Sequence, residues 1–180
     1  MLLHEITPET TAYQLAHILE RKLSLEVALS NETSSNAHFE FDPDRRIVLC
    51  SNQPISVIAK KEASDDRAVA SYRAVLGMAS KAIRPSDKIP ECILYAVFSC
   101  LHEFGHYRQS LECDRFEFEK MANQRESMLD AAKRDAQRNA DEGMSPQLVY
   151  SIFEDRYRKI PVENDADIRA LTMLAQIVAP

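Results

Sequence analysis

Apolar and polar residues follow two different periods in the first part of the chain. In residues 7–23, apolar side chains recur every three or four positions after a Thr-Pro-Glu start, which predicts an amphipathic helix. Residues 25–30 alternate between apolar and polar side chains, and residues 38–41 and 47–50 are short runs of β-forming residues. The sequence Asp-Pro-Asp at 42–44 is typical of a turn. The pattern predicts one helix followed by three short strands.

The rest of the chain has helical periodicity. Residues 64–83 have one apolar side, with Ser64 as a candidate N-cap, and a helix that is apolar nearly all round is expected to begin at Pro90. Residues 114–142 combine alternating charges with an apolar stripe, which predicts a long helix with a solvated face. Two more helices are expected over 145–160 and 161–178. The predicted fold class is α+β and mostly helical, with a small three-stranded sheet or β-hairpin beside a central, buried helix.

Length, charge and composition limit the class of protein that this chain can be. At 180 residues the chain is expected to form a single domain over 1–180, and its net charge of −6 argues against direct contact with nucleic acid. No apolar run approaches the roughly 18 residues that span a membrane, and the first residues lack the basic start of a signal peptide, so no membrane attachment and a cytoplasmic location are expected. The cysteines have no C-x-x-C spacing and are expected to be reduced, mostly buried core residues. They are Cys50, Cys92, Cys100 and Cys113.

The segment SCLHEFGHYRQS, residues 99–110, carries the strongest chemical signal. On a helix, His102 and His106 lie on one face and can direct their imidazoles at one metal ion, while Glu103 can reach a water molecule beside it. Burying these three groups without partners would cost several kcal/mol, which a divalent cation would offset. In the alternative interpretation, the histidines lie at an exposed C-terminal end of the helix and complement its dipole.

A third ligand is needed for a catalytic zinc site. Glu163 and Asp167 are four residues apart on the last predicted helix, so Glu163 can bind the metal while Asp167 accepts a hydrogen bond from a ligand histidine. Other acidic residues lie nearer in sequence to His106 but would have to fold back to reach the metal, so Glu163 ranks first. They are Glu112, Asp114 and Glu117.

The motifs H-E-F-G-H and E-N-D-A-D together resemble the gluzincin pattern, and most closely the ImmA/IrrE family of small metallopeptidases. The resemblance implies a zincin-like domain with a central HExxH helix, and a zinc ion held by His102, His106 and Glu163. It also implies that Glu103 is the general base and that Asp167 is hydrogen-bonded to a ligand. Proteases of this family act on repressor or regulator proteins, often in phage, mobile-element or stress-response contexts. This chain departs from the family in a helical insertion at about 114–158 and in lacking helix-turn-helix or sensor appendages.

Two functional hypotheses follow. The first is a zinc endopeptidase that hydrolyses peptide bonds in a specific regulatory protein, with Glu103 assisting the attack of water. The second is a non-catalytic phage or mobile-element interaction protein built on a zincin-like core. The oxyanion donor is not assigned among the available tyrosines, which are Tyr107, Tyr150 and Tyr157. The remaining histidines have no partner spacing and are expected at the surface or half-buried: His4, His17 and His38.

Overall fold

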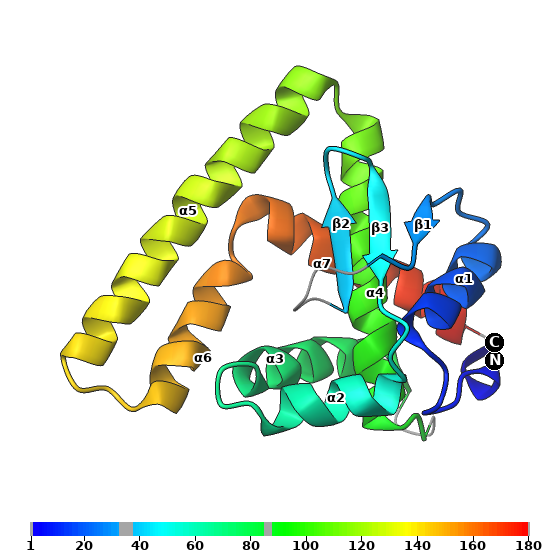
Figure 1. Ribbon diagram of the computed structural model, residues 1–180, viewed down its shortest axis with the longest axis horizontal. Helices are drawn as coiled ribbons and strands as arrows, with labels where there is room; N and C mark the ends of the chain where they lie inside the picture. Colours follow the sequence, from blue (N-terminus) through cyan, green and yellow to red (C-terminus); the bar gives the residue numbers. More distant parts are fainter. Residues whose placement is uncertain (1, 33–37, 85–87, 180) are drawn as a thin grey trace.

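Helix α4 (Glu91–Glu112) is the element around which the other parts of the protein are arranged (Figure 1). The computed structural model describes residues 2–32, 38–84 and 88–179. Pro90 directly precedes α4, as predicted, and the helix is buried along most of its length because its first half is apolar on nearly every side. α4 packs against α1 (Ala12–Leu23), α2 (Ile55–Ser64), α3 (Val69–Ala79) and α7 (Pro161–Val178).

The strands form a small mixed sheet in the order β1-β3-β2. β1 (Leu29–Ser30) pairs with β3 (Ile47–Cys50) in parallel, and β2 (Phe39–Asp42) pairs with β3 in antiparallel fashion. The side chain of Asp42 accepts hydrogen bonds from the backbone N–H groups of Asp44 and Arg45, which closes the turn between β2 and β3. The described residues thus confirm the predicted fold class: seven α-helices with one three-stranded sheet.

The N-terminal half differs from the prediction in helix boundaries. α1 begins at Ala12 rather than near Pro8, because Thr11 and Gln14 form a capping box in which each side chain bonds the other's backbone N–H. Ser64 does not cap α3; it is the last residue of α2, a helix that the sequence analysis missed. α3 begins only at Val69. Short 3-10 helices, η1 (Leu2–Glu5) and η2 (Ser80–Ala82), complete this half.

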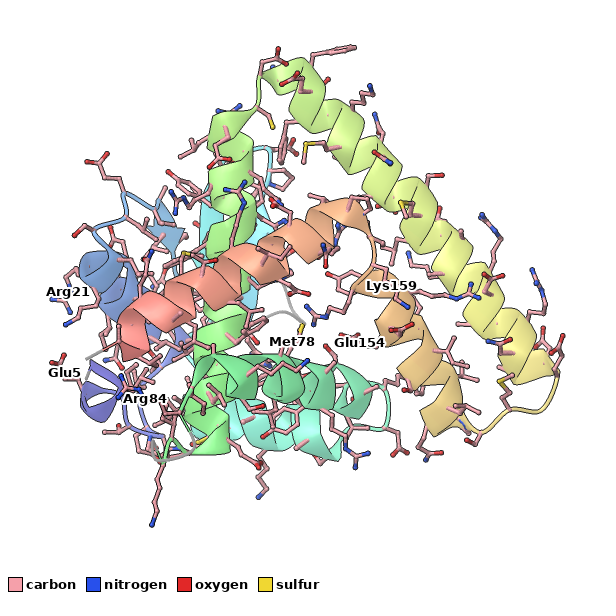
Figure 2. The ribbon with its side chains drawn as sticks, turned by 180° about the vertical axis from the view of Figure 1, so that it is seen from behind. Glu5, Arg21, Met78, Arg84, Glu154 and Lys159 are labelled. Atoms are coloured by element: carbon pink, nitrogen blue, oxygen red, sulfur yellow. The ribbon has the colours of Figure 1, made fainter. Side chains whose placement is uncertain are left out.

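The segment 114–158, predicted to be an insertion, forms a helical hairpin. α5 (Arg115–Asp141) leads away from the end of α4, and α6 (Pro146–Tyr157) returns between α5 and α3 toward the start of α7 (Figure 1). The side chain of Asp114 accepts a hydrogen bond from the backbone N–H of Glu117 and so begins α5. Gly143, with φ of 84°, allows the turn between the two helices. Seen from behind, α7 continues from this hairpin and crosses α4 (Figure 2).

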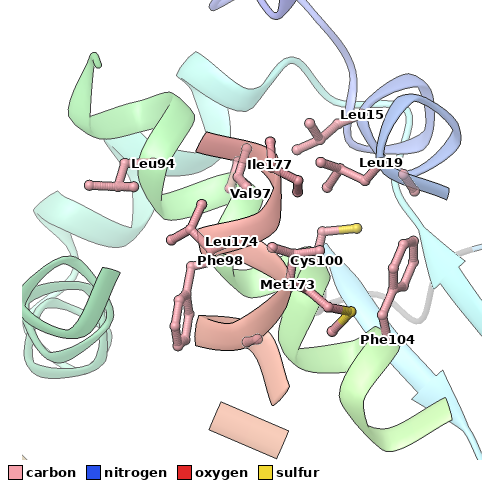
Figure 3. Close-up of a cluster of buried hydrophobic side chains, with 14 of the residues drawn as sticks. Leu15, Leu19, Leu94, Val97, Phe98, Cys100, Phe104, Met173, Leu174 and Ile177 are labelled. Carbon is pink, nitrogen blue, oxygen red and sulfur yellow. The ribbon is translucent and has the colours of Figure 1, made fainter. Parts of the chain in front are cut away.

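The hydrophobic core lies where α1, α4 and α7 meet (Figure 3). Leu15 and Leu19 come from α1, Phe98 from α4 and Leu174 from α7, and all four are fully buried. Each such side chain contributes roughly 1.5–3 kcal/mol relative to exposure to water. The core thus fixes how α7 lies against α4.

The cysteines are free, with Cys50 and Cys100 buried and Cys92 and Cys113 half-buried. Burial raises the pKa of the Cys50 thiol to about 12. None of the helices in the described ranges has both the length and the apolar character needed to cross a membrane.

Candidate metal centre

Three side chains from α4 and α7 converge on one point. Nε2 of His102 lies 3.1 Å from Nε2 of His106 and 3.2 Å from Oε2 of Glu163, and the third side of this triangle is 3.3 Å. Around a tetrahedral zinc ion with ligands at about 2.0–2.2 Å, neighbouring ligand atoms are about 3.3–3.6 Å apart. The triangle therefore has nearly the size of one face of a zinc coordination sphere.

Both imidazoles are held from behind by acceptors. Nδ1 of His102 lies 2.8 Å from Oδ1 of Asp167, and Nδ1 of His106 lies 2.8 Å from Oε1 of Gln109. The amide nitrogen of Gln109 donates to the backbone carbonyl of Val162 and to Asp165, so its oxygen is the atom that faces His106. Each Nδ1 consequently carries a hydrogen, so the Nε2 that each ring turns toward Glu163 is the atom available to a metal ion or a second proton.

Three lone pairs meeting within hydrogen-bond distance require a positive charge between them. Burial lowers the pKa of His102, but its hydrogen bonds to Asp167 and Glu163 outweigh this effect and raise the pKa to about 9. Burial raises the pKa of Glu163, but hydrogen bonds from His102 and His106 overcome it and hold the pKa well below its ordinary value. A site that attracts a proton so strongly attracts a divalent cation for the same reason. The two nitrogens and one carboxylate oxygen are a donor set that suits zinc, so this group can hold a metal ion.

Two further groups from the α5–α6 hairpin reach Glu163. The hydroxyl of Tyr157 donates to Oε2 of Glu163 over 2.6 Å, and the guanidinium of Arg125 pairs with Oε1. Burial, together with the Glu163 charge, raises the pKa of Tyr157, so its hydroxyl keeps its proton. The long helix α5 is therefore tied to the centre through Arg125.

Glu103 lies beside the triangle and does not belong to it. Its Oε2 accepts a hydrogen bond of 2.9 Å from the backbone N–H of Phe41 in β2. The N–H of Ser51 donates to the carbonyl of His38, so these two residues form a hydrogen-bonded pair between the strands. In an antiparallel pair, hydrogen-bonded and non-hydrogen-bonded residues alternate, so the N–H and C=O groups of Phe39 and Phe41 point away from β3. β2 is the edge strand of the described sheet, and this outward edge faces Glu103.

Two cavities adjoin the centre. One, of about 410 Å³, lies between the outward edge of β2 and α5 and is lined by His106, Arg125 and Phe118 among others. The other, of about 360 Å³, is lined by His102 and by residues of α2, α3 and α6. Both are lined by Phe39, Glu103 and Tyr157. Space for a ligand is therefore available on two sides of Glu103.

The acidic residues nearer to His106 in sequence are engaged elsewhere. Glu112 forms a bidentate pair with Arg169 at 2.8 Å, and Asp114 caps α5. The group of potential ligands that the described residues bring together contains neither of these residues nor Glu117. His102 is buried within α4 rather than exposed at its end, which excludes the helix-dipole interpretation for that residue.

Several contributors were not singled out from the sequence. Gln109 follows His106 at helical spacing, a signal that could have identified it as a partner. Arg125 lies in a stretch of alternating charges, and nothing local distinguishes it from its neighbours. Of the tyrosines considered, Tyr157 contacts the centre, whereas the Tyr107 hydroxyl donates to the backbone carbonyl of Glu26.

Comparisons with known proteins identify no relative of this chain. No protein-family model matches the chain, and no curated protein or solved structure is detectably similar to it. The site is therefore interpreted from its own geometry.

Proposed function

We propose that this protein is a zinc-dependent peptidase. The proposal rests on one observation: three ligand atoms form a triangle of zinc-site dimensions, and the carboxylate of Glu103 lies next to it without belonging to it. A purely structural zinc site has four protein ligands and needs no base, whereas a catalytic site has three ligands and a base. His102, His106 and Glu163 would hold the ion.

Glu103 would act as the general base. A bound zinc ion would lower the pKa of a water molecule toward neutrality and polarise the carbonyl of the peptide bond. Glu103 takes one proton from the water, whose oxygen adds to the carbonyl carbon, and returns that proton to the nitrogen as the C–N bond breaks. The N–H of Phe41 holds one oxygen of Glu103, so the other oxygen is left to carry the proton. Tyr157 is the candidate donor to the oxygen on which negative charge develops.

An extended peptide fits the surroundings of Glu103. The outward N–H and C=O groups of Phe39 and the outward carbonyl of Phe41 would pair with such a peptide as an added strand, since the N–H of Phe41 already bonds Glu103. The two cavities would then take side chains on either side of the cleaved bond. This arrangement supports a peptide as substrate over a small molecule.

The resemblance of the two motifs to the ImmA/IrrE family supports a narrower proposal. By that analogy, the substrate is a repressor or another regulatory protein, and the segment 114–158 is an insertion into a zincin-like domain. The contact between Arg125 and Glu163 supports a role for this segment at the site.

The decisive experiment compares wild-type protein with the variants Glu103→Gln and His106→Ala. Zinc content is measured by elemental analysis, and cleavage of a random peptide mixture by mass spectrometry. We expect wild type and Glu103→Gln to hold one zinc per chain, and hydrolysis to fall about 10²- to 10⁴-fold in Glu103→Gln, because only the base is lost.

The variant His106→Ala is expected to lose both zinc and hydrolysis. Unchanged hydrolysis in Glu103→Gln would contradict the mechanism. Zinc in the wild type without cleavage of any peptide or candidate regulator would favour the non-catalytic interaction protein instead.

A further inference from the structure

The cavity of about 360 Å³ beside His102 and Glu103 also has a polar wall far from them in sequence. His38, just before β2, and Glu62, on α2, contribute to this wall. Its volume lies in the range of ligand-binding pockets, about 300–1,000 Å³. The mechanism above uses neither residue.

His38 brings an unused hydrogen-bonding atom to the cavity. Its side chain is only 10% exposed, and its buried Nε2 has no hydrogen-bond partner among the described residues. Its other ring nitrogen, Nδ1, lies 3.4 Å from the Ser51 hydroxyl. Burial, and secondly the charge of Lys61, lower the pKa of His38, so the ring is neutral at pH 7. In the tautomer in which Nδ1 donates its hydrogen to the Ser51 hydroxyl, Nε2 is a hydrogen-bond acceptor.

Glu62 brings a carboxylate that no lysine or arginine of the described residues meets at ion-pair distance. Burial raises the pKa of Glu62, and the charge of Lys61 partly opposes this rise. Among the described residues, the nitrogen within ion-pair distance of Glu62 is Nε2 of His38, which lies 3.8 Å from Oε1 of Glu62. Glu154, labelled on α6 in Figure 2, is the other acid of this wall, and it is paired with Arg158 at 2.7 Å. Arg158 also pairs with Asp167 at 2.9 Å, so its charge is already shared. The wall is left with a net negative charge at Glu62.

The distance between these two acceptors suits one nitrogen donor. An ammonium nitrogen at the usual hydrogen-bond distance of about 2.8–2.9 Å from each can bridge atoms that are 3.8 Å apart. The apolar part of the lining, which includes Ile58, Val75 and Phe98, can cover the methylene groups of a long side chain. A lysine side chain has both features.

We propose that this cavity is a specificity pocket for a lysine residue adjoining the cleaved peptide bond, whose ammonium group donates to Oε1 of Glu62 and Nε2 of His38. The proposal rests on the proposed peptidase function and adds the class of side chain that the site selects. Glu62 and His38 are then specificity-determining residues, and neither takes part in bond cleavage.

The test uses ligands that bind zinc themselves, so it does not require a known substrate. A series of N-acylated amino-acid hydroxamates differs only in the side chain: lysine, norleucine or glutamate. Their affinities for zinc-loaded protein are measured by titration calorimetry. We expect the lysine compound to bind about tenfold or more tightly than the norleucine compound, because a charge-assisted hydrogen bond replaces a contact with CH₃.

The variant Glu62→Gln removes the charge at nearly constant size. We expect the affinity ratio of the lysine and norleucine compounds to fall to about one, while the norleucine affinity stays near its wild-type value. The matched control is Glu119→Gln, which removes the same charge from an exposed position on α5 and should leave the ratio unchanged. If Glu62→Gln does not fold, the affinity ratio of the lysine and norleucine compounds for the wild type alone decides whether the pocket selects lysine.

The outcomes separate this proposal from the proposed function. Tight binding of both compounds without preference for lysine, or a preference that persists in Glu62→Gln, overturns the specificity pocket and leaves the zinc site standing. Failure of every hydroxamate to bind the zinc-treated wild type overturns the catalytic zinc site and the pocket together.

Discussion

At the residue scale, both histidines of the candidate metal centre and the neighbouring Glu103 are each oriented by a second group. Asp167 and Gln109 fix the two imidazole rings, and the N–H of Phe41 fixes Glu103. The i and i+4 spacing predicted that His102 and His106 share a helix face, whereas Glu163 was chosen as the best acidic candidate and by the resemblance of the two motifs to the gluzincin pattern. The contributions of Phe41 and Arg125 depend on chain segments brought together only by folding, so no local pattern could predict them.

Tyr157 offers a prediction at this scale. The change Tyr157→Phe removes the hydroxyl that donates to Glu163 and is available to a developing negative charge. We expect kcat of peptide hydrolysis to fall about 10²- to 10³-fold, the usual effect of losing one oxyanion donor, with zinc content retained. Steady-state kinetics and elemental analysis provide the two measurements.

The matched control is Tyr107→Phe, whose hydroxyl bonds the Glu26 carbonyl away from the centre. It should leave kcat near the wild-type value. If Tyr157→Phe matched this control, Tyr157 would have a packing role only.

At the element scale, the centre depends on how closely α7 approaches α4. Gly105, the fourth residue of the HEFGH motif, faces the backbone of Ala166, and a Cβ at Gly105 would lie 2.9 Å from the Ala166 carbonyl oxygen. The sequence predicted both helices, from the prolines at their starts and their apolar residues, and also three strands, although the first covers Leu29–Ser30 rather than 25–30. It missed α2 and misplaced the start of α1, where a capping box outcompeted the earlier Thr-Pro start.

The change Gly105→Ala tests this close approach. The added methyl group meets backbone, which cannot rotate away as a flexible side chain can, so α4 and α7 must separate. We expect a loss of about 1–3 kcal/mol in the free energy of unfolding and weaker zinc binding, since the ligands lie on both helices. Denaturant unfolding and zinc titration measure the two effects.

Gly77→Ala is the control for helix propensity. Gly77 lies inside α3 with open space where a Cβ would be, so the same change should stabilise the protein by about 0.5–1 kcal/mol. Equal effects of the two changes would show that α7 can shift at no cost.

At the scale of the whole molecule, the candidate metal ligands join the central helix α4 to α7, which follows the long hairpin of α5 and α6. Glu163 follows directly on this hairpin, and Arg125 of α5 reaches back to it. The resemblance to known peptidases could suggest which residues bind metal, but not how the segment 114–158 would lie, because a solvated charged helix has no preferred partner in the sequence.

Zinc should therefore stabilise the entire fold. At a zinc concentration of 100 times Kd, we expect a gain of about 2.7 kcal/mol and a rise in Tm of about 5–10 °C. Scanning calorimetry with zinc, and then with added chelator, measures the gain and its reversal. Glu163→Gln should abolish most of the rise, whereas Glu112→Gln, which alters a surface pair with Arg169, should preserve it. A rise of equal size in Glu163→Gln would place the zinc elsewhere.

The separation of the ligands along the chain also has a consequence for biosynthesis. Glu163 is added 61 residues after His102, an interval that takes a ribosome about 3–12 s at ordinary rates of about 5–20 residues per second. During that interval the nascent chain already carries both histidines and Glu103, but it does not yet have the Glu163 carboxylate that completes the candidate metal centre. By the proposed function, a nascent chain would therefore have no peptidase activity until α7 has been made and has docked on α4.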